Sequence, residues 1–162
     1  MLVFISPIGW EVFRNLFKNI GLMKVNIVYN NTETAKAILR CLKYVIGNSE
    51  AALNPFKNPY KKSQSLEMAE KSDFLIVESF IDGLPKGFQF AKIIKKKVLL
   101  LFYTGELEIE EEGAFSLSLP FKLNRLSDKI KELMAQPAPG IEEYEKLEER
   151  FPELRERKDH HR

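Results

Sequence analysis

Residues 73–103, DFLIVESFIDGLPKGFQFAKIIKKKVLLLFY, decide the fold of this chain. An apolar run (74–77) is followed by a turn that contains Gly and Pro, a helical stretch (88–96) and a second apolar run (98–102). Strand, loop, helix and strand at this spacing predict a βαβ unit. Both apolar runs are continuous rather than alternating, which is typical of parallel strands that are covered on both faces.

The loop after the first of these strands is the predicted place for a ligand. In parallel sheets, ligands bind in the crevice beyond the carboxyl ends of the strands. The loop from Glu78 to Gly87 follows such an end. We therefore expect any small-molecule site of this protein to lie there.

The rest of the chain continues the alternation of strands and helices. Further strands are predicted at 2–5, 23–29, 50–53 and 114–119, and further helices at 10–20, 32–46, 63–71 and 127–135. This order predicts an α/β, Rossmann- or flavodoxin-like three-layer sandwich with a mainly parallel sheet. The breaker QPAPG (136–140) ends this domain, so we expect the domain over 1–136 and a linker with a charged C-terminal helix, interrupted near Pro152, over 137–162.

The composition narrows the classes of function. Hydrophobic residues make up 44% of the chain and charged residues 30%, which is typical of a globular protein. The net charge of +2 gives no electrostatic case for nucleic-acid binding. The two histidines, His160 and His161, stand at the extreme C-terminus, which excludes histidine-based acid–base catalysis and argues against a zinc site. No metal and no cofactor are expected.

The chain also lacks the signals of a secreted or membrane protein. Cys41 is the single cysteine, so the chain cannot form an internal disulfide, which fits a reducing compartment. No apolar run approaches the length of about 18 residues that a membrane-spanning helix needs. The apolar N-terminus lacks the basic start of a signal peptide. We therefore expect a cytoplasmic protein without a membrane partner.

Three segments resemble the nucleoside 2-deoxyribosyltransferase family, including its deoxynucleoside monophosphate N-glycosidase branch. They are VFISPI (3–8), AEKSDFLIVE (69–78), and GFQFA (87–91) with the following KVLLLF (97–102). The resemblance implies a reaction at an N-glycosidic bond, a nucleoside- or nucleotide-like partner, and a homodimer. It makes residues 1–136 a domain similar to those enzymes.

The resemblance also implies where the site residues lie. The family's nucleophilic Glu corresponds to Gln89, a neutral amide that is a very poor nucleophile, and its second acid falls near Ser65. Glu78 and Asp82 are the carboxylates that remain as candidate catalytic groups; a helix cap or an ion pair for Glu78, and a turn position for Asp82, are the structural alternatives. The candidate ligand-binding residues are Ser6, Gly9, Gly87, Gln89 and Tyr29.

Three functions therefore stay open from the sequence. The first is an N-glycosidase or deoxyribosyltransferase. The sequence does not decide whether the protein is an enzyme at all. The second is an inactive nucleotide-binding or sensing module that keeps the fold, which the loss of the carboxylate at Gln89 favours. The third is an interaction protein in which the charged C-terminal helix is the working part.

Overall fold

The computed structural model describes residues 23–46, 49–56, 67, 70–103 and 115–155 of the chain. The strand predicted at 2–5, the helix at 10–20 and most of the helix at 63–71 lie outside these residues. Within them, no helix is long and apolar enough to cross a membrane.

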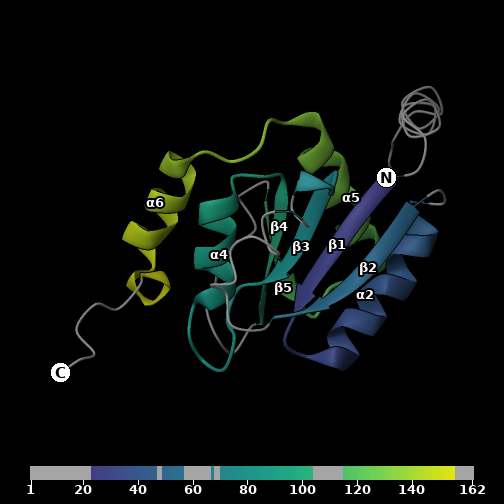
Figure 1. Cartoon of the computed structure of the whole chain (residues 1–162), viewed down its shortest axis with the longest axis horizontal. Helices are drawn as coiled ribbons and strands as arrows, with labels where there is room; N and C mark the ends of the chain where they lie inside the picture. Colours follow the sequence, from purple (N-terminus) through teal and green to yellow (C-terminus); the bar gives the residue numbers. More distant parts are fainter. Residues whose placement is uncertain (1–22, 47–48, 57–66, 68–69, 104–114, 156–162) are drawn as a thin grey trace.

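A five-stranded sheet forms the middle layer of the molecule (Figure 1). Its strands are β1 (Met23–Tyr29), β2 (Ser49–Pro55), β3 (Phe74–Glu78), β4 (Val98–Tyr103) and β5 (Ser116–Leu119). Every neighbouring pair is parallel, and the order is β2-β1-β3-β4-β5. This is the flavodoxin-like strand order, so the predicted α/β fold class is confirmed.

Helices cover both faces of the sheet. They are α2 (Thr32–Val45), α4 (Lys86–Ile94), α5 (Leu123–Ala135), α6 (Ile141–Arg150) and the 3₁₀ helix η1 (Pro152–Leu154). Right-handed crossovers put α2 and α4 on opposite faces, because the chain moves from β1 and from β3 toward opposite edges. α5 packs beside α2, while α6 lies beside α4 at the other side of the molecule (Figure 1).

The core is built around the two strands that the sequence marked most clearly. All five residues of β3 are buried, as are the first five of β4. α2 adds a buried stripe of Ala35, Ile38, Leu42 and Val45, at helical spacing. Each large apolar side chain removed from water here contributes about 1.5–3 kcal/mol of burial free energy.

The helix boundaries differ from the predicted ones at α4 and α5. α4 was expected over 88–96 but begins two residues earlier, after Pro85, and ends at Ile94 because Lys95 adopts a left-handed conformation (φ 56°). α5 was expected from about 127 but begins at Leu123. Neither helix has a side-chain cap at its N-terminus, which removes the signal by which such a start is recognised in sequence.

Candidate functional site

The strand order reverses between β1 and β3, and the chain leaves these two strands toward opposite edges of the sheet. In open parallel sheets such a switch point opens the crevice where ligands bind. The β1–α2 loop (Asn30 and Asn31) meets Glu78, the last residue of β3, at this end. This crevice is therefore the candidate functional site, and it includes the start of the loop from Glu78 to Gly87 where the sequence predicted a ligand.

Glu78 ends β3 and is the acidic group at the centre of this junction. Its side chain is 3% exposed. One carboxylate oxygen, Oε1, accepts hydrogen bonds from the backbone N–H groups of Asn30 and Asn31, each at 2.8 Å. Bonds to an ionised acceptor are stronger than neutral ones, and they compensate for burying the charge. Glu78 thus fastens the end of β3 to the β1–α2 loop.

The same loop is held by two further contacts. Asn31 is the N-cap of α2, where its Oδ1 accepts from the Thr34 backbone N–H at 3.0 Å. The Thr34 hydroxyl in turn hydrogen-bonds the hydroxyl of Tyr103 at the end of β4. The ends of three neighbouring strands are therefore joined through one loop.

The turn after β3 closes tightly against the start of α4. Ile81 and Leu84 exchange two backbone hydrogen bonds, with Asp82 (φ 52°) and Gly83 (φ 79°) between them. Gly87 lies against the backbone of β3: a Cβ atom there would lie 1.7 Å from the carbonyl oxygen of Glu78. The glycine at 87 is therefore required by packing rather than by backbone conformation.

The structure brings only some of the predicted site residues together. Tyr29, Glu78 and Gly87 lie around the carboxyl ends of β1 and β3. Asp82 is exposed in the turn. Ser6 and Gly9 lie outside the described residues.

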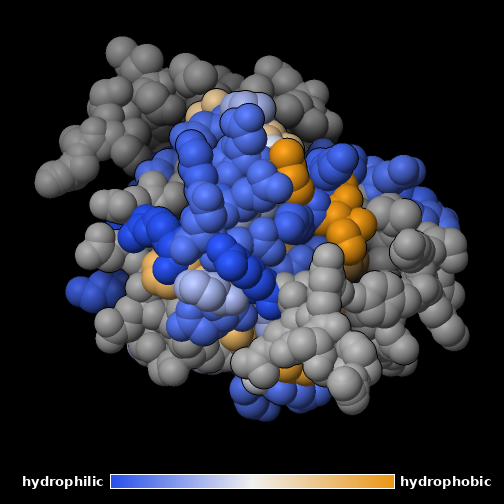
Figure 2. Space-filling model, turned by 90° about the vertical axis from the view of Figure 1, so that its left-hand side faces the viewer, coloured by the Kyte–Doolittle hydropathy of each residue, from blue (hydrophilic) through white to orange (hydrophobic). Residues whose placement is uncertain are grey.

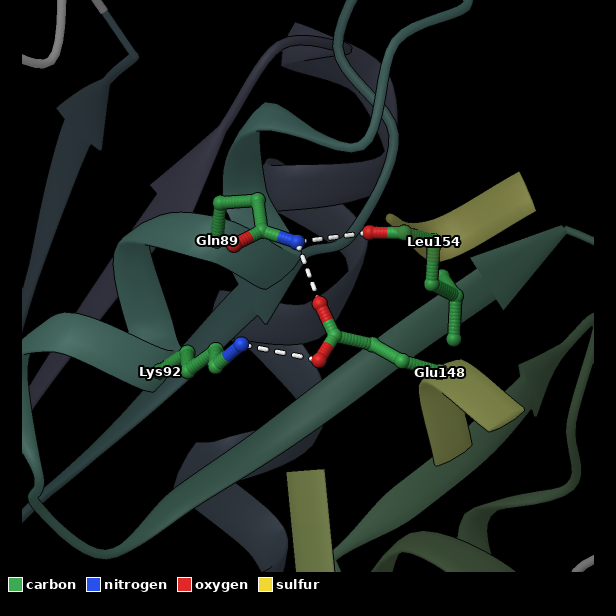
Figure 3. Close-up of polar contacts among 4 residues, drawn as sticks. All are labelled: Gln89, Lys92, Glu148 and Leu154. Carbon is green, nitrogen blue, oxygen red and sulfur yellow. Dashed lines mark hydrogen bonds and ion pairs between the residues drawn. The ribbon is translucent and has the colours of Figure 1, made fainter. Parts of the chain in front are cut away.

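Gln89 is engaged elsewhere, on the side of α4 that faces the C-terminal helix (Figure 3). Its Nε2 donates to Glu148 Oε2 at 2.9 Å and to the carbonyl oxygen of Leu154 at 2.6 Å. Lys92, one turn further along α4, pairs with the other oxygen of Glu148 at 2.8 Å. The amide that the resemblance assigned to a ligand is thus taken by the chain's own C-terminal segment.

Sequence reasoning missed the residues that complete both sets of contacts. Asn30 and Asn31 lie between the predicted strand 23–29 and the predicted helix 32–46, which contains Thr34, and Asn31 as an N-cap was the available signal. Glu148 is one of many glutamates in its segment and carried no distinguishing signal. Tyr144 and Leu154 lie in the segment that was predicted as a charged C-terminal helix, and both are buried.

Three solved structures that this chain resembles in fold are receiver domains. No protein-family model matches the sequence, and no curated protein matches it. The signal receiver domain of a DNA-binding response regulator from Colwellia psychrerythraea 34H superposes with a TM-score of 0.51 at 16% identity, covering 70% of this chain and 99% of that one. A response regulator receiver domain from Bacillus halodurans C-125 gives 0.51 at 21% identity, over 72% and 99%.

A third structure carries a metal ion. The receiver domain of a sensor histidine kinase from Pseudomonas aeruginosa PAO1 has a TM-score of 0.50 and 14% identity, covering 72% of this chain and all of that one, with magnesium coordinated in its active site cleft. Identities this low establish a shared fold and nothing finer.

These matches overturn the resemblance to nucleoside 2-deoxyribosyltransferases. The N-glycosidase function and the nucleoside-like partner are wrong, and so is nucleotide binding by the inactive module, whose sensing role stays a prediction. The homodimer that rested on the same resemblance loses its support. The geometry gives a reason. Both edges of β3 are occupied, by β1 and β4, and the turn that follows β1 is Asn30-Asn31. The Ser6-Pro7 turn on which the resemblance depended lies outside the described residues.

The crevice residues do not fit a magnesium ion. Mg²⁺ is held in proteins by one or two carboxylates together with waters and substrate phosphates. Among the described residues, β1 is followed by the neutral Asn30 and Asn31, and the one buried carboxylate, that of Glu78, already accepts their N–H groups through one oxygen. Among the residues that the structure describes, no three His, Cys, Asp or Glu side chains form a group able to hold a metal.

Proposed function

We propose that this protein is a receiver-like regulatory module that acts by binding other proteins and not by converting a small molecule. Its fold supports this, because the solved structures that resemble it are described as signal receiver domains of response regulators and of a sensor kinase. The observation that carries the proposal is the state of the crevice: Glu78 is buried, and one of its carboxylate oxygens accepts hydrogen bonds from two backbone N–H groups.

The hydrogen bonds from Asn30 and Asn31 to Glu78 join the β1–α2 loop to the end of β3, so the crevice has a structural role. A ligand or metal that took Glu78 Oε1 would have to displace the loop N–H groups from a charged acceptor, and each such bond contributes about 1.5–3 kcal/mol. The module therefore keeps one arrangement of the β1–α2 loop without an ion.

We also propose a cytoplasmic location, which the single cysteine, Cys41, supports.

Magnesium calorimetry on the full chain tests the proposal. The wild-type protein should give no saturable heat. The Asn30→Asp/Asn31→Asp variant adds two carboxylates beside Glu78 while aspartate keeps the N-cap function at 31, and it should bind magnesium. An Asp placed instead at Asn124, exposed on α5, adds charge away from the crevice and should not bind. Saturable magnesium binding by the wild-type chain at this crevice would refute the proposal.

A further inference from the structure

The C-terminal arm, defined as residues 141–155, lies against α4 and the edge of the core (Figure 1). Tyr144 is its main anchor and is 1% exposed. The Tyr144 ring meets the Phe88 ring edge-on at 5.5 Å between centroids and the Phe115 ring at 5.4 Å. Leu154, at the far end of the arm, is fully buried. The arm therefore fills an aromatic pocket at one end and an apolar one at the other.

A polar latch sits between these two anchors (Figure 3). Glu148 uses one oxygen for Gln89 and the other for Lys92, so both carboxylate oxygens are satisfied by α4. The side chains of Lys92 and Glu148 are 23% and 12% exposed. A pair with this exposure is specific in geometry yet still accessible to water and salt.

The docked face of α6 has the spacing of a helical recognition stripe. Tyr144, Leu147, Glu148 and Phe151 recur at i, i+3, i+4 and i+7. The outer face carries exposed acidic residues, among them Glu142, Glu145 and Glu149. Figure 2, which views the molecule from the side of α6, shows a largely hydrophilic surface with small hydrophobic areas. The surface of α4 thus accepts an acidic amphipathic helix.

The docking is imperfect at its main anchor. The Tyr144 hydroxyl is buried and has no hydrogen-bond partner among the described residues. Burial raises the pKa of this phenol, with the negative charge of Glu143 adding to the effect. A buried hydroxyl without a partner destabilises the docked state relative to one in which water bonds it. The arm is joined to α5 through residues 136–140, which contain two prolines and no helix.

We propose that the surface of α4 is a docking site for an acidic helix of a partner protein that carries the pattern Tyr-x-x-Leu-Glu, and that the C-terminal arm occupies this site in cis. The arm and the partner helix compete for the aromatic pocket and for Gln89 and Lys92. Charge complementarity selects the partner, because Lys92 of α4 pairs with Glu148 of an arm that is rich in glutamate. This inference uses only the α4 surface and stands independently of the crevice.

A labelled peptide with the arm's own sequence, IEEYEKLEERFPELR (141–155), tests the competition by fluorescence anisotropy against full-length chains. The Glu148→Lys chain has lost its cis latch, so it should bind the peptide about tenfold more tightly than the wild type, which corresponds to about 1.4 kcal/mol. The Glu145→Lys chain carries the same charge change on the outer face and should bind as the wild type does. Equal affinity of the two variants would overturn the proposal.

A second pair of variants tests the aromatic pocket. Tyr144→Phe in the chain removes the unpaired hydroxyl, so the arm should dock better and the chain should bind the peptide several-fold more weakly. A peptide with Ala in place of Tyr144 should not bind the Glu148→Lys chain. Binding that ignores both changes would contradict the assigned anchor.

The reciprocal charge swap covers the case in which Glu148→Lys does not fold. The Lys92→Glu chain should prefer a peptide with Lys at position 148 over the native peptide, and the opposite preference would refute the latch.

Sedimentation of the wild-type chain distinguishes a partner protein from a second copy of this chain as the occupant of the site. A dimer that forms with rising concentration would assign the site to the arm of a second copy and would overturn the partner-protein assignment.

Discussion

At the residue scale, Glu78 connects segments that are far apart in sequence. It reaches Asn30 and Asn31, which precede it by 48 and 47 residues. A charged acceptor that serves two backbone donors fixes the loop more firmly than a neutral side chain can. The carboxylate at the end of β3 therefore sets the geometry of the whole crevice.

Replacing Glu78 by Gln should lower the free energy of unfolding by about 1–2 kcal/mol, because two charge-assisted bonds become neutral ones. Urea denaturation measures this change. The matched control is Asp82→Asn, which makes the same carboxylate-to-amide change at an exposed turn position where Asn tolerates positive φ. If the two variants lose equal stability, Glu78 does not hold the loop.

Gly87→Ala should be more damaging than any surface change. Its Cβ would overlap the Glu78 carbonyl oxygen, so β3 and α4 must separate, at a cost of about 3 kcal/mol or more. Thermal unfolding followed by circular dichroism checks this. Gly140→Ala is the control, since its Cβ meets nothing closer than 3.6 Å. If Gly87→Ala is as stable as Gly140→Ala, the contact between residue 87 and the Glu78 carbonyl oxygen relaxes at no cost.

The sequence places Glu78 correctly at a strand end but does not reveal what it binds. Its partners are backbone N–H groups, which every residue carries and which leave no mark in the side-chain pattern. The partners of Gln89 lie 59 and 65 residues downstream, beyond any local pattern. The sequence suggested a catalytic role for Glu78 and the resemblance a ligand for Gln89, and tertiary packing gives both residues partners within the protein.

At the element scale, α2 depends on its cap. Asn31→Ala removes the bond from the Thr34 N–H and should cost about 1 kcal/mol of stability. Asn30→Ala is the matched control, because Asn30 joins the junction through its backbone N–H, which the substitution keeps. Urea denaturation of both variants compares them directly. Equal losses would mean that the cap contributes nothing measurable.

Elements with strong patterns were predicted well, and irregular ends were not. The apolar runs predicted β3 and β4 to within one residue, since burial on both faces leaves no polar position. β2 was found at its predicted place and extends further, to Pro55. The end of α4 was missed because Lys95 takes a conformation that usually needs glycine.

At the scale of the whole molecule, the C-terminal arm and the sheet should differ in stability. Amide hydrogen exchange measures the free energy of opening residue by residue. The amides of α6 should exchange through an opening of lower free energy than those of β3 and β4, because the arm is held by two anchors and one latch. The difference should widen at high salt, which screens the latch. Identical opening free energies would mean that the arm never separates from the body.

The fold explains why the sequence resembles nucleoside 2-deoxyribosyltransferases although that family prediction is wrong. An Asp, four apolar residues, a loop, a helix and an apolar strand are the common features of a flavodoxin-like sheet, and many unrelated activities share that sheet. The contacts in the crevice, where the Asn30 and Asn31 N–H groups bond to Glu78, are what distinguish one such activity from another. Those contacts appear only when β1 and β3 are seen side by side.

The amide spectrum of the isotope-labelled wild-type chain, recorded while magnesium is added, tests the central claim most directly. We expect the amide signals of Asn30, Asn31 and Ser79 to keep their positions throughout, because Glu78 already accepts the loop N–H groups and is the one buried carboxylate among the described residues. A saturable shift confined to these three amides would place a metal at the crevice and would contradict a module that works without one.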